Sequence, residues 1–227
     1  MKYNSLFFDL DNTLLDFSKS EEIALTLLFE HYQCAEHENI REFYNIENRK
    51  LWDKHENGEV SFEYLLENRF PRTLAHYEVE IDGKEWDKKY HSLLREHPFL
   101  MEDDVPNVID TLSKSYRLFI ATNGVEETQI ERLKKMKLLT FFEKVYTSQS
   151  IGYQKPDIRF FKYIEEHTPN FDATKALMIG DSVKTDIRGG NNAGMDTCLL
   201  SPNGVKKSEI KSTYEIKTIS ELYTILN

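Results

Sequence analysis

The amino-acid sequence predicts an α/β protein, with a doubly wound (Rossmann-like) parallel sheet as its core and an inserted helical domain. Two observations support this fold class. From residue 105 onward, short apolar runs alternate with segments of helical periodicity, which is the pattern of strand and helix in a parallel sheet. Before that region, about 100 residues separate the first apolar run from the second, far more than a strand-to-helix connection needs.

Five runs that are apolar almost throughout are expected to be strands, because helices cover both faces of a parallel sheet. Helices are expected where apolar residues recur with helical spacing between these runs. The predicted strands cover residues 5–10, 116–121, 144–148, 176–181 and 196–201. The predicted helices cover residues 106–114, 126–137, 158–167 and 185–193.

The long insertion is expected to form a helical cap domain over residues 16–97, with residues 1–15 and 98–227 forming the core. Apolar and aromatic residues recur in it at intervals of three, four, seven and eight, which is typical of amphipathic helices. Helices are expected over residues 18–32 and 39–56, and Ser61 is expected to cap the next one. Most of the aromatic residues in this segment are expected to pack in its core.

Composition excludes several classes of protein. The 227-residue chain is 40% hydrophobic and 30% charged, as in an ordinary globular protein. A formal net charge of −10 would repel a nucleic-acid polymer, and the lysines at 134, 135 and 137 are expected to be only a solvated helix face. Cys34 and Cys198 are too few for a disulfide framework, and the apolar start is too short for a signal peptide or membrane span. We therefore expect a cytoplasmic protein.

Polar residues follow three of the predicted strands at the edge where open α/β sheets bind ligands. Singly, each is a residue that an ordinary turn or helix cap would use. Together they bring carboxylates, a hydroxyl and an ammonium group to one edge, so we expect them to form one site. Its expected members are Asp9, Asp11, Thr122, Asn123, Lys155, Asp181 and Asp186.

The chemistry of this group predicts a magnesium site that binds a phosphoryl group. Several carboxylates at one edge repel one another unless a divalent cation lies among them, and oxygen ligands suit Mg²⁺. A phosphoryl group in transfer needs its oxygens neutralised from several directions. Lys155 is expected to supply charge and Thr122 a hydroxyl. Further donors are the backbone amides of Leu10, Asp11 and Asn123.

These residues resemble the four motifs of the haloacid dehalogenase superfamily of aspartate-nucleophile phosphotransferases. The run DLDNT at residues 9–13 matches the first motif, Thr122 the second and Lys155 the third. The run GDSVKTD at residues 180–186 matches the fourth. All four motifs occur in order, and the resemblance covers nearly the whole chain. An insertion directly after the first motif resembles the subclass in which a helical cap closes over the leaving group.

The resemblance implies roles for these residues. Asp9 would attack phosphorus to form an aspartyl-phosphate, and Asp11 would protonate the leaving oxygen and then activate water. The metal ligands would be Asp9, Asp11 through its backbone carbonyl, and Asp181. Asp186 would orient either a water molecule on the metal or Lys155.

Several loops are similar to a bacterial branch of nucleotidases that dephosphorylate pyrimidine nucleoside 5'-monophosphates, including noncanonical ones. The similarity lies in residues 8–17, 121–125, 150–157 and 196–198, and in the cap segment 48–70. It implies a small phosphomonoester substrate whose base stacks on an aromatic ring. The expected substrate-binding residues are Leu10, Thr122, Asn123 and Lys155 in the core, with Phe17, Asn48, Trp52 and Arg69; further aromatic candidates are Tyr44, Tyr64 and Phe70.

Two other functions remain open at this point. A phosphatase or phosphomutase for sugar phosphates would share the core, because only the cap selects the leaving group. A receiver-type signalling module also uses a phosphorylated Asp, a Thr and a Lys, but it needs neither the insertion nor a second aspartate at Asp11. Turnover of p-nitrophenyl phosphate with magnesium would separate an enzyme from a receiver. The chain is expected to be a monomer or a homodimer.

Overall fold

The computed structural model describes residues 2–204 and 209–226. Its contacts divide the chain into two compact units, the first made of Met1–Phe17 and Pro98–Asn227, and the second of Ser18–His97. The cap was expected to begin at residue 16, two residues earlier. The two segments that leave the first unit are joined by hydrogen bonds, from the Asp16 N–H to the Phe99 carbonyl at 3.0 Å and from the Met101 N–H to the Leu14 carbonyl at 2.9 Å.

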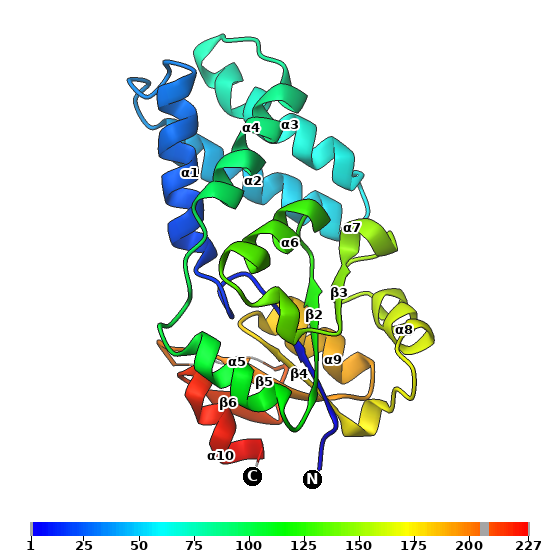
Figure 1. Ribbon diagram of the computed structural model, residues 1–227. Coiled ribbons are helices and arrows are strands. Elements are labelled where there is room, and N and C mark those ends of the chain that lie inside the picture. The colour runs from blue at the N-terminus through cyan, green and yellow to red at the C-terminus, as the bar shows by residue number, and fades with distance from the viewer. Residues whose placement is uncertain (1, 205–208, 227) are drawn as a thin grey trace. The chain divides into compact units, whose positions relative to one another are not determined.

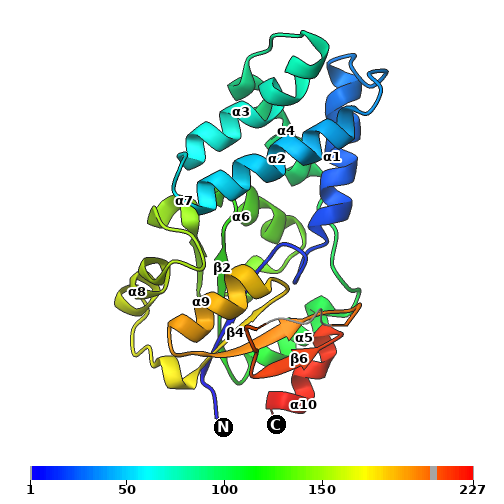
Figure 2. The same ribbon diagram turned by 180° about the vertical axis from the view of Figure 1, so that it is seen from behind.

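The first unit is built on a six-stranded parallel sheet in the order β3-β2-β1-β4-β5-β6 (Figures 1 and 2). This confirms the predicted α/β fold class. The chain adds β2 on one side of β1 and later β4 on the other, so the direction of winding reverses beside β1, where such sheets bind ligands. The strands are β1 (Ser5–Phe8), β2 (Arg117–Thr122), β3 (Lys144–Thr147), β4 (Ala176–Gly180), β5 (Asp196–Leu200) and β6 (Tyr214–Ile216).

All five predicted strands are present, and β6 is an addition of three residues, too short to show a periodic pattern. The predicted helix over 185–193 is two elements, because the chain first makes a π-helical turn, η4, in which the N–H groups of Asp186 and Ile187 both bind the Ser182 carbonyl. The α-helices of this unit are α5 (Val105–Ser113), α6 (Glu126–Lys135), α7 (Ser148–Ile151), α8 (Ile158–His167), α9 (Arg188–Asn192) and α10 (Leu222–Leu226). The shorter turns are η2 (Leu139–Phe141), η3 (Ala173–Lys175), η4 (Val183–Ile187) and η5 (Ile219–Glu221).

Side chains of the sheet alternate between two apolar clusters, as the two-residue period of a strand requires. Leu6 and Phe8 of β1 belong to the cluster that includes side chains from α5, α6 and α10. Phe7 belongs to the other cluster, which includes side chains from α8. Figures 1 and 2 show these helices on the two faces of the sheet. Burial on both faces explains why the strands are apolar almost throughout.

The second unit is built from four helices, and α3 packs against both α2 and α4. Ser61 caps α3 as predicted, because its Oγ accepts a hydrogen bond from the Tyr64 N–H at 3.0 Å. The core of this unit is aromatic: Tyr44, Phe70 and Tyr90 have no exposed surface. The helices are α1 (Phe17–His31), α2 (Ile40–Glu56), α3 (Phe62–Leu74) and α4 (Gly83–Glu96), with a 3₁₀ turn η1 (Ala75–Tyr77) after α3.

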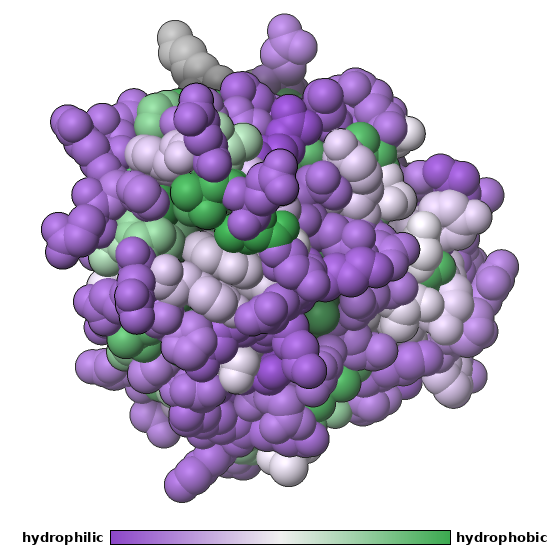
Figure 3. Space-filling model, turned by 90° about the horizontal axis from the view of Figure 1, so that it is seen from above, coloured by the Kyte–Doolittle hydropathy of each residue, from purple (hydrophilic) through white to green (hydrophobic). Residues whose placement is uncertain are grey.

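The surface seen in Figure 3 is largely hydrophilic, with apolar residues in scattered groups, as expected for a chain with 30% charged residues. Among the described residues, no helix has the length and apolar character that a membrane crossing requires. Cys34 and Cys198 are both free and buried.

Candidate active site

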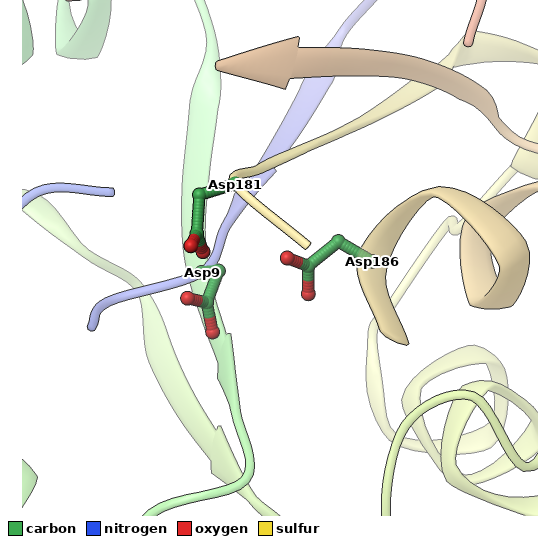
Figure 4. A group of neighbouring side chains, drawn as sticks. All are labelled: Asp9, Asp181 and Asp186. Carbon is green, nitrogen blue, oxygen red and sulfur yellow. The ribbon is translucent and has the colours of Figure 1, made fainter. Parts of the chain in front are cut away.

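Three carboxylates meet where β1 and β4 end (Figure 4). Asp9 follows β1 and Asp181 follows β4, and these strands are neighbours in register, so both residues leave the sheet at the same edge. Asp186 reaches the same place from the turn η4. One oxygen atom from each carboxylate lies within 4.8 Å of the other two, and Asp9 and Asp186 are buried.

Gly180 is the residue that makes room for Asp186. A Cβ atom at position 180 would lie 2.2 Å from Oδ2 of Asp186, a distance that no side chain could accommodate without moving the carboxylate. The same Oδ2 accepts a hydrogen bond from the Ser182 N–H at 3.0 Å. Position 180 of the fourth motif therefore requires a glycine, because a side chain there would displace Asp186.

Lys155 lies among these carboxylates with 1% of its surface exposed. Its ammonium donates hydrogen bonds to Asp9 Oδ1 at 2.7 Å, to Asp186 Oδ1 at 2.6 Å and to the Ala121 carbonyl at 2.6 Å, which uses its three donors. Asn123 holds the backbone of Lys155, since its Oδ1 accepts from the Lys155 N–H at 2.9 Å and its Nδ2 donates to the Lys155 carbonyl at 3.0 Å. The amide side chain of Asn123 therefore supports the lysine.

Burial and mutual repulsion shift the ionisation of this cluster. Desolvation raises the pKa of Asp9 well above its usual range and that of Asp181 to about 6, and the charge of Asp186 adds to both shifts. Burial opposes the charged form of Lys155, but the carboxylates of Asp186 and Asp9 outweigh it and raise the pKa of Lys155. When all three carboxylates are ionised, the single ammonium leaves two negative charges uncompensated. A divalent cation would balance them, and a donor set made only of oxygen atoms fits Mg²⁺.

Asp11 faces a different set of partners, from helix α6. Arg132 Nη1 donates to Asp11 Oδ1 at 2.5 Å, and Gln129 Nε2 donates to Asp11 Oδ2 at 2.7 Å. Gln129 Nε2 also donates to Thr122 Oγ1 at 3.0 Å, and that oxygen accepts from the Gly124 N–H at 3.2 Å. The structure thus places Asp11 and Thr122 in one hydrogen-bond network, beside the network of Asp9 and Lys155.

Gln129 and Arg132 were not among the predicted site residues, although the sequence holds a signal for them. Both lie on the same helical stripe as Leu133 and Met136, which pack in the core. A polar side chain at a core-facing position of a helix needs a polar partner, so it marks a possible site. Lys134 and Lys135 on this helix, and Lys137 just after it, were expected to form a solvated face, and all three are exposed.

Two other expected substrate contacts lie in the first unit. The Leu10 side chain has no exposed surface, so only its backbone is available to a ligand. Phe17 is partly buried, and the centre of its ring lies 5.7 Å from the guanidinium carbon of Arg132. This places an aromatic ring next to the arginine that holds Asp11.

The expected contacts in the second unit differ in exposure. Arg69 is buried and pairs with Asp87, to which its Nε donates at 3.1 Å; this favours a structural role in place of the expected substrate contact. Asn48 is partly buried, and its Oδ1 has no hydrogen-bond partner among the described residues. Trp52 is partly buried against His55 and Phe62. Of the other aromatic candidates, Tyr44 and Phe70 belong to the core and Tyr64 is exposed.

Comparison with known proteins adds to this geometry. The sequence model of the haloacid dehalogenase-like hydrolases matches residues 6–200. The HAD-hydrolase YfnB of Bacillus subtilis is 39% identical in sequence over 100% of this chain and 96% of its own. A crystal structure of YfnB bound to magnesium covers 100% of both chains, with a TM-score of 0.91 and 38% sequence identity. The pyrimidine 5'-nucleotidase PynA of Streptococcus pneumoniae is 34% identical over 100% of this chain and 96% of its own. The pyrimidine 5'-nucleotidase YjjG of Escherichia coli is 29% identical over 100% and 99%.

Proposed function

The chain belongs to the haloacid dehalogenase-like hydrolases, and from this premise we propose that it is a magnesium-dependent phosphomonoester hydrolase that works through an aspartyl-phosphate. The observation that supports this most is the placement of two aspartates two residues apart in separate networks. Asp9 lies against Lys155 in the carboxylate cluster, whereas Asp11 lies against Gln129 and Arg132. A nucleophile and an acid–base group need such different surroundings.

The metal would be held by the carboxylates of Asp9 and Asp181 and by the backbone carbonyl of Asp11. Asp186, hydrogen-bonded to Lys155, would orient that lysine and any water on the metal. When bound, the cation would neutralise the carboxylates and polarise the phosphoryl oxygens. Two observations support this, the two uncompensated negative charges of the cluster and the bound magnesium in the structure of YfnB.

The residues of the chain carry the two half-reactions. In the first, a carboxylate oxygen of Asp9 bonds to phosphorus, the bond from phosphorus to the ester oxygen breaks, and protonated Asp11 gives its proton to that oxygen. In the second, water attacks the aspartyl-phosphate while Asp11 takes its proton, which releases phosphate and regenerates Asp9. Lys155 and the Thr122 hydroxyl would bind the phosphoryl oxygens throughout.

For the substrate, we propose a pyrimidine nucleoside 5'-monophosphate. The support is the activity named for PynA and YjjG, both of which match this chain over all of its length. The catalytic core binds only the phosphoryl group that all candidate substrates share, so selection of the base must come from residues outside it. The candidates in the second unit are Tyr64, whose ring is exposed, and Asn48, whose buried amide oxygen has no hydrogen-bond partner among the described residues.

The test is a steady-state comparison of dUMP, dTMP, UMP, AMP, glucose 6-phosphate and glucose 1-phosphate at equal magnesium. We expect a pyrimidine nucleotide to have the highest kcat/KM. A sugar phosphate that exceeds every nucleotide would reject the nucleotidase and leave a phosphatase. A protein that turns over neither these esters nor p-nitrophenyl phosphate, but holds a stable aspartyl-phosphate, would instead be a receiver-type module.

A further inference from the structure

The carboxylate of Asp11 is held at both oxygens by one helix. Arg132 and Gln129 are three residues apart on α6, so their side chains lie side by side and each binds a different oxygen of Asp11. They also bind each other, since Arg132 Nη1 donates to Gln129 Oε1 at 2.8 Å. The carboxylate therefore cannot rotate without breaking a hydrogen bond to this pair.

Two observations indicate that the chain is built around this pair. A Cβ atom on Gly124 would lie 2.2 Å from Gln129 Nε2, so the glycine leaves the space through which Gln129 reaches Asp11. Arg132 has 1% of its surface exposed, and within the described part of the chain its ion-pair partner is Asp11. Its Nε and Nη2 find no hydrogen-bond partner there. Burying a guanidinium with so few partners costs free energy, and an apolar side chain would fill the same space in the core without that cost.

We propose that Gln129 and Arg132 are positioning residues, which orient the Asp11 carboxylate for proton transfer to the leaving group and from the attacking water. This inference rests on the acid–base role proposed for Asp11. Through Gln129 the same network includes the Thr122 hydroxyl. One side chain therefore positions both Asp11 and the hydroxyl that would donate a hydrogen bond to the phosphoryl group.

The experiment compares two esters of nearly equal shape. p-Nitrophenyl phosphate releases a phenolate that needs no proton, whereas p-nitrobenzyl phosphate releases an alkoxide that does. The quantity measured is kcat/KM, because it includes every step up to departure of the leaving group. Neither ester is a nucleotide, so the result does not depend on the natural substrate.

Arg132→Met and Gln129→Met should lower kcat/KM for the benzyl ester by on the order of 10- to 100-fold, within the range that general acid catalysis contributes. With Arg132→Met the phenyl ester should lose less than about 3-fold, since its leaving group departs unaided. Gln129→Met should add a loss that both esters share, because it also removes a hydrogen bond to Thr122. Arg132→Lys should recover part of the loss because it restores a positive donor. In a protein that already carries Asp11→Asn, Arg132→Met should not lower the ratio of kcat/KM for the benzyl ester to that for the phenyl ester any further.

The matched control is Lys134→Met on the exposed side of α6, which should leave the ratio of the two esters unchanged. Equal losses on both esters, or no loss, would overturn the positioning role, and thermal unfolding of each variant separates such losses from misfolding. If Asp9→Asn retains turnover of the phenyl ester, the proposed function itself fails, and this inference with it. If Asp9→Asn and Asp11→Asn lose activity as proposed, but Arg132→Met and Gln129→Met leave the ratio of kcat/KM for the two esters unchanged, only the positioning role is rejected.

Discussion

The ammonium nitrogen of Lys155 lies 2.7 Å from Oδ1 of Asp9, and both side chains are buried. The pair joins the end of β1 to the loop between α7 and α8, 146 residues later in the sequence. Because Asp186 binds the same ammonium at 2.6 Å, the lysine is held from two sides and keeps a positive charge beside the oxygen proposed to attack phosphorus.

Asp9→Asn should abolish turnover while the fold survives. The amide has nearly the shape of the carboxylate but does not attack phosphorus, so we expect kcat to fall at least about 1,000-fold. Burial raises the pKa of Asp9, which means that the ionised carboxylate opposes folding, and its removal should leave the metal-free protein at least as stable at pH 7. Steady-state kinetics and urea unfolding in a chelator measure the two effects. Activity within tenfold of wild type would contradict the assignment of the nucleophile.

Gly180→Ala should disable the site through Asp186. The added Cβ would lie 2.2 Å from Asp186 Oδ2, so the carboxylate must move and its hydrogen bond to Lys155 weakens. We expect turnover to fall on the order of 10- to 100-fold, since a displacement of about 1 Å near the chemistry can cost that much. Gly58→Ala is the control: φ at Gly58 is +75° with no atom near the new Cβ, so stability should drop by about 1 kcal/mol without loss of turnover. Equal activity of Gly180→Ala and wild type would show that Asp186 has room to move.

Arg69→Met should destabilise the protein and leave substrate binding unchanged. Arg69 is buried against Asp87, and loss of one partner from a buried pair costs roughly 3–5 kcal/mol. Burial already raises the pKa of Asp87 despite the arginine, so the variant leaves this carboxyl without its counter-charge. Arg72→Met, which removes a half-exposed partner of Glu47, should cost less. Unfolding and KM are the measurements; a KM raised more than tenfold with unchanged stability would restore Arg69 as a substrate contact.

The sequence was sufficient for features that depend on local pattern. Strand ends carry the motif residues, and parallel strands meet at one edge, so the gathering of Asp9, Asp181 and Lys155 was predictable. The partners of Asp11 were not predicted, because Arg132 lies in a helix rich in charged residues, and such a helix usually presents its charged side chains to solvent. The helical stripe that Arg132 shares with Leu133 indicates that a polar partner is needed, but only the position of α6 in the structure shows that this partner is Asp11. For the same reason the exposure of an aromatic residue such as Tyr44 could not be decided from helical spacing alone.

Magnesium affinity should fall as the pH drops through about 6. In the metal-free protein, burial and the neighbouring charge of Asp186 raise the pKa of Asp181 to about 6, and that of Asp9 is raised as well. A proton and the metal compete for the same oxygens, so each proton that must be displaced weakens apparent affinity about tenfold per pH unit below the pKa.

The direction in which stability changes with pH follows from the same raised pKa values of Asp181 and Asp9. Because the folded-state pKa of Asp181 lies above its unfolded value, the ionised form opposes folding, and the metal-free protein should lose stability as the pH rises from about 4 through about 6. Added magnesium should reverse this, so its stabilising effect grows with pH. Calorimetric titration and thermal unfolding at pH 5, 6, 7 and 8 measure both trends. Asp181→Asn should bind magnesium weakly, with a smaller pH dependence. A dissociation constant that stays the same from pH 8 to pH 5 would show that the metal lies away from this cluster.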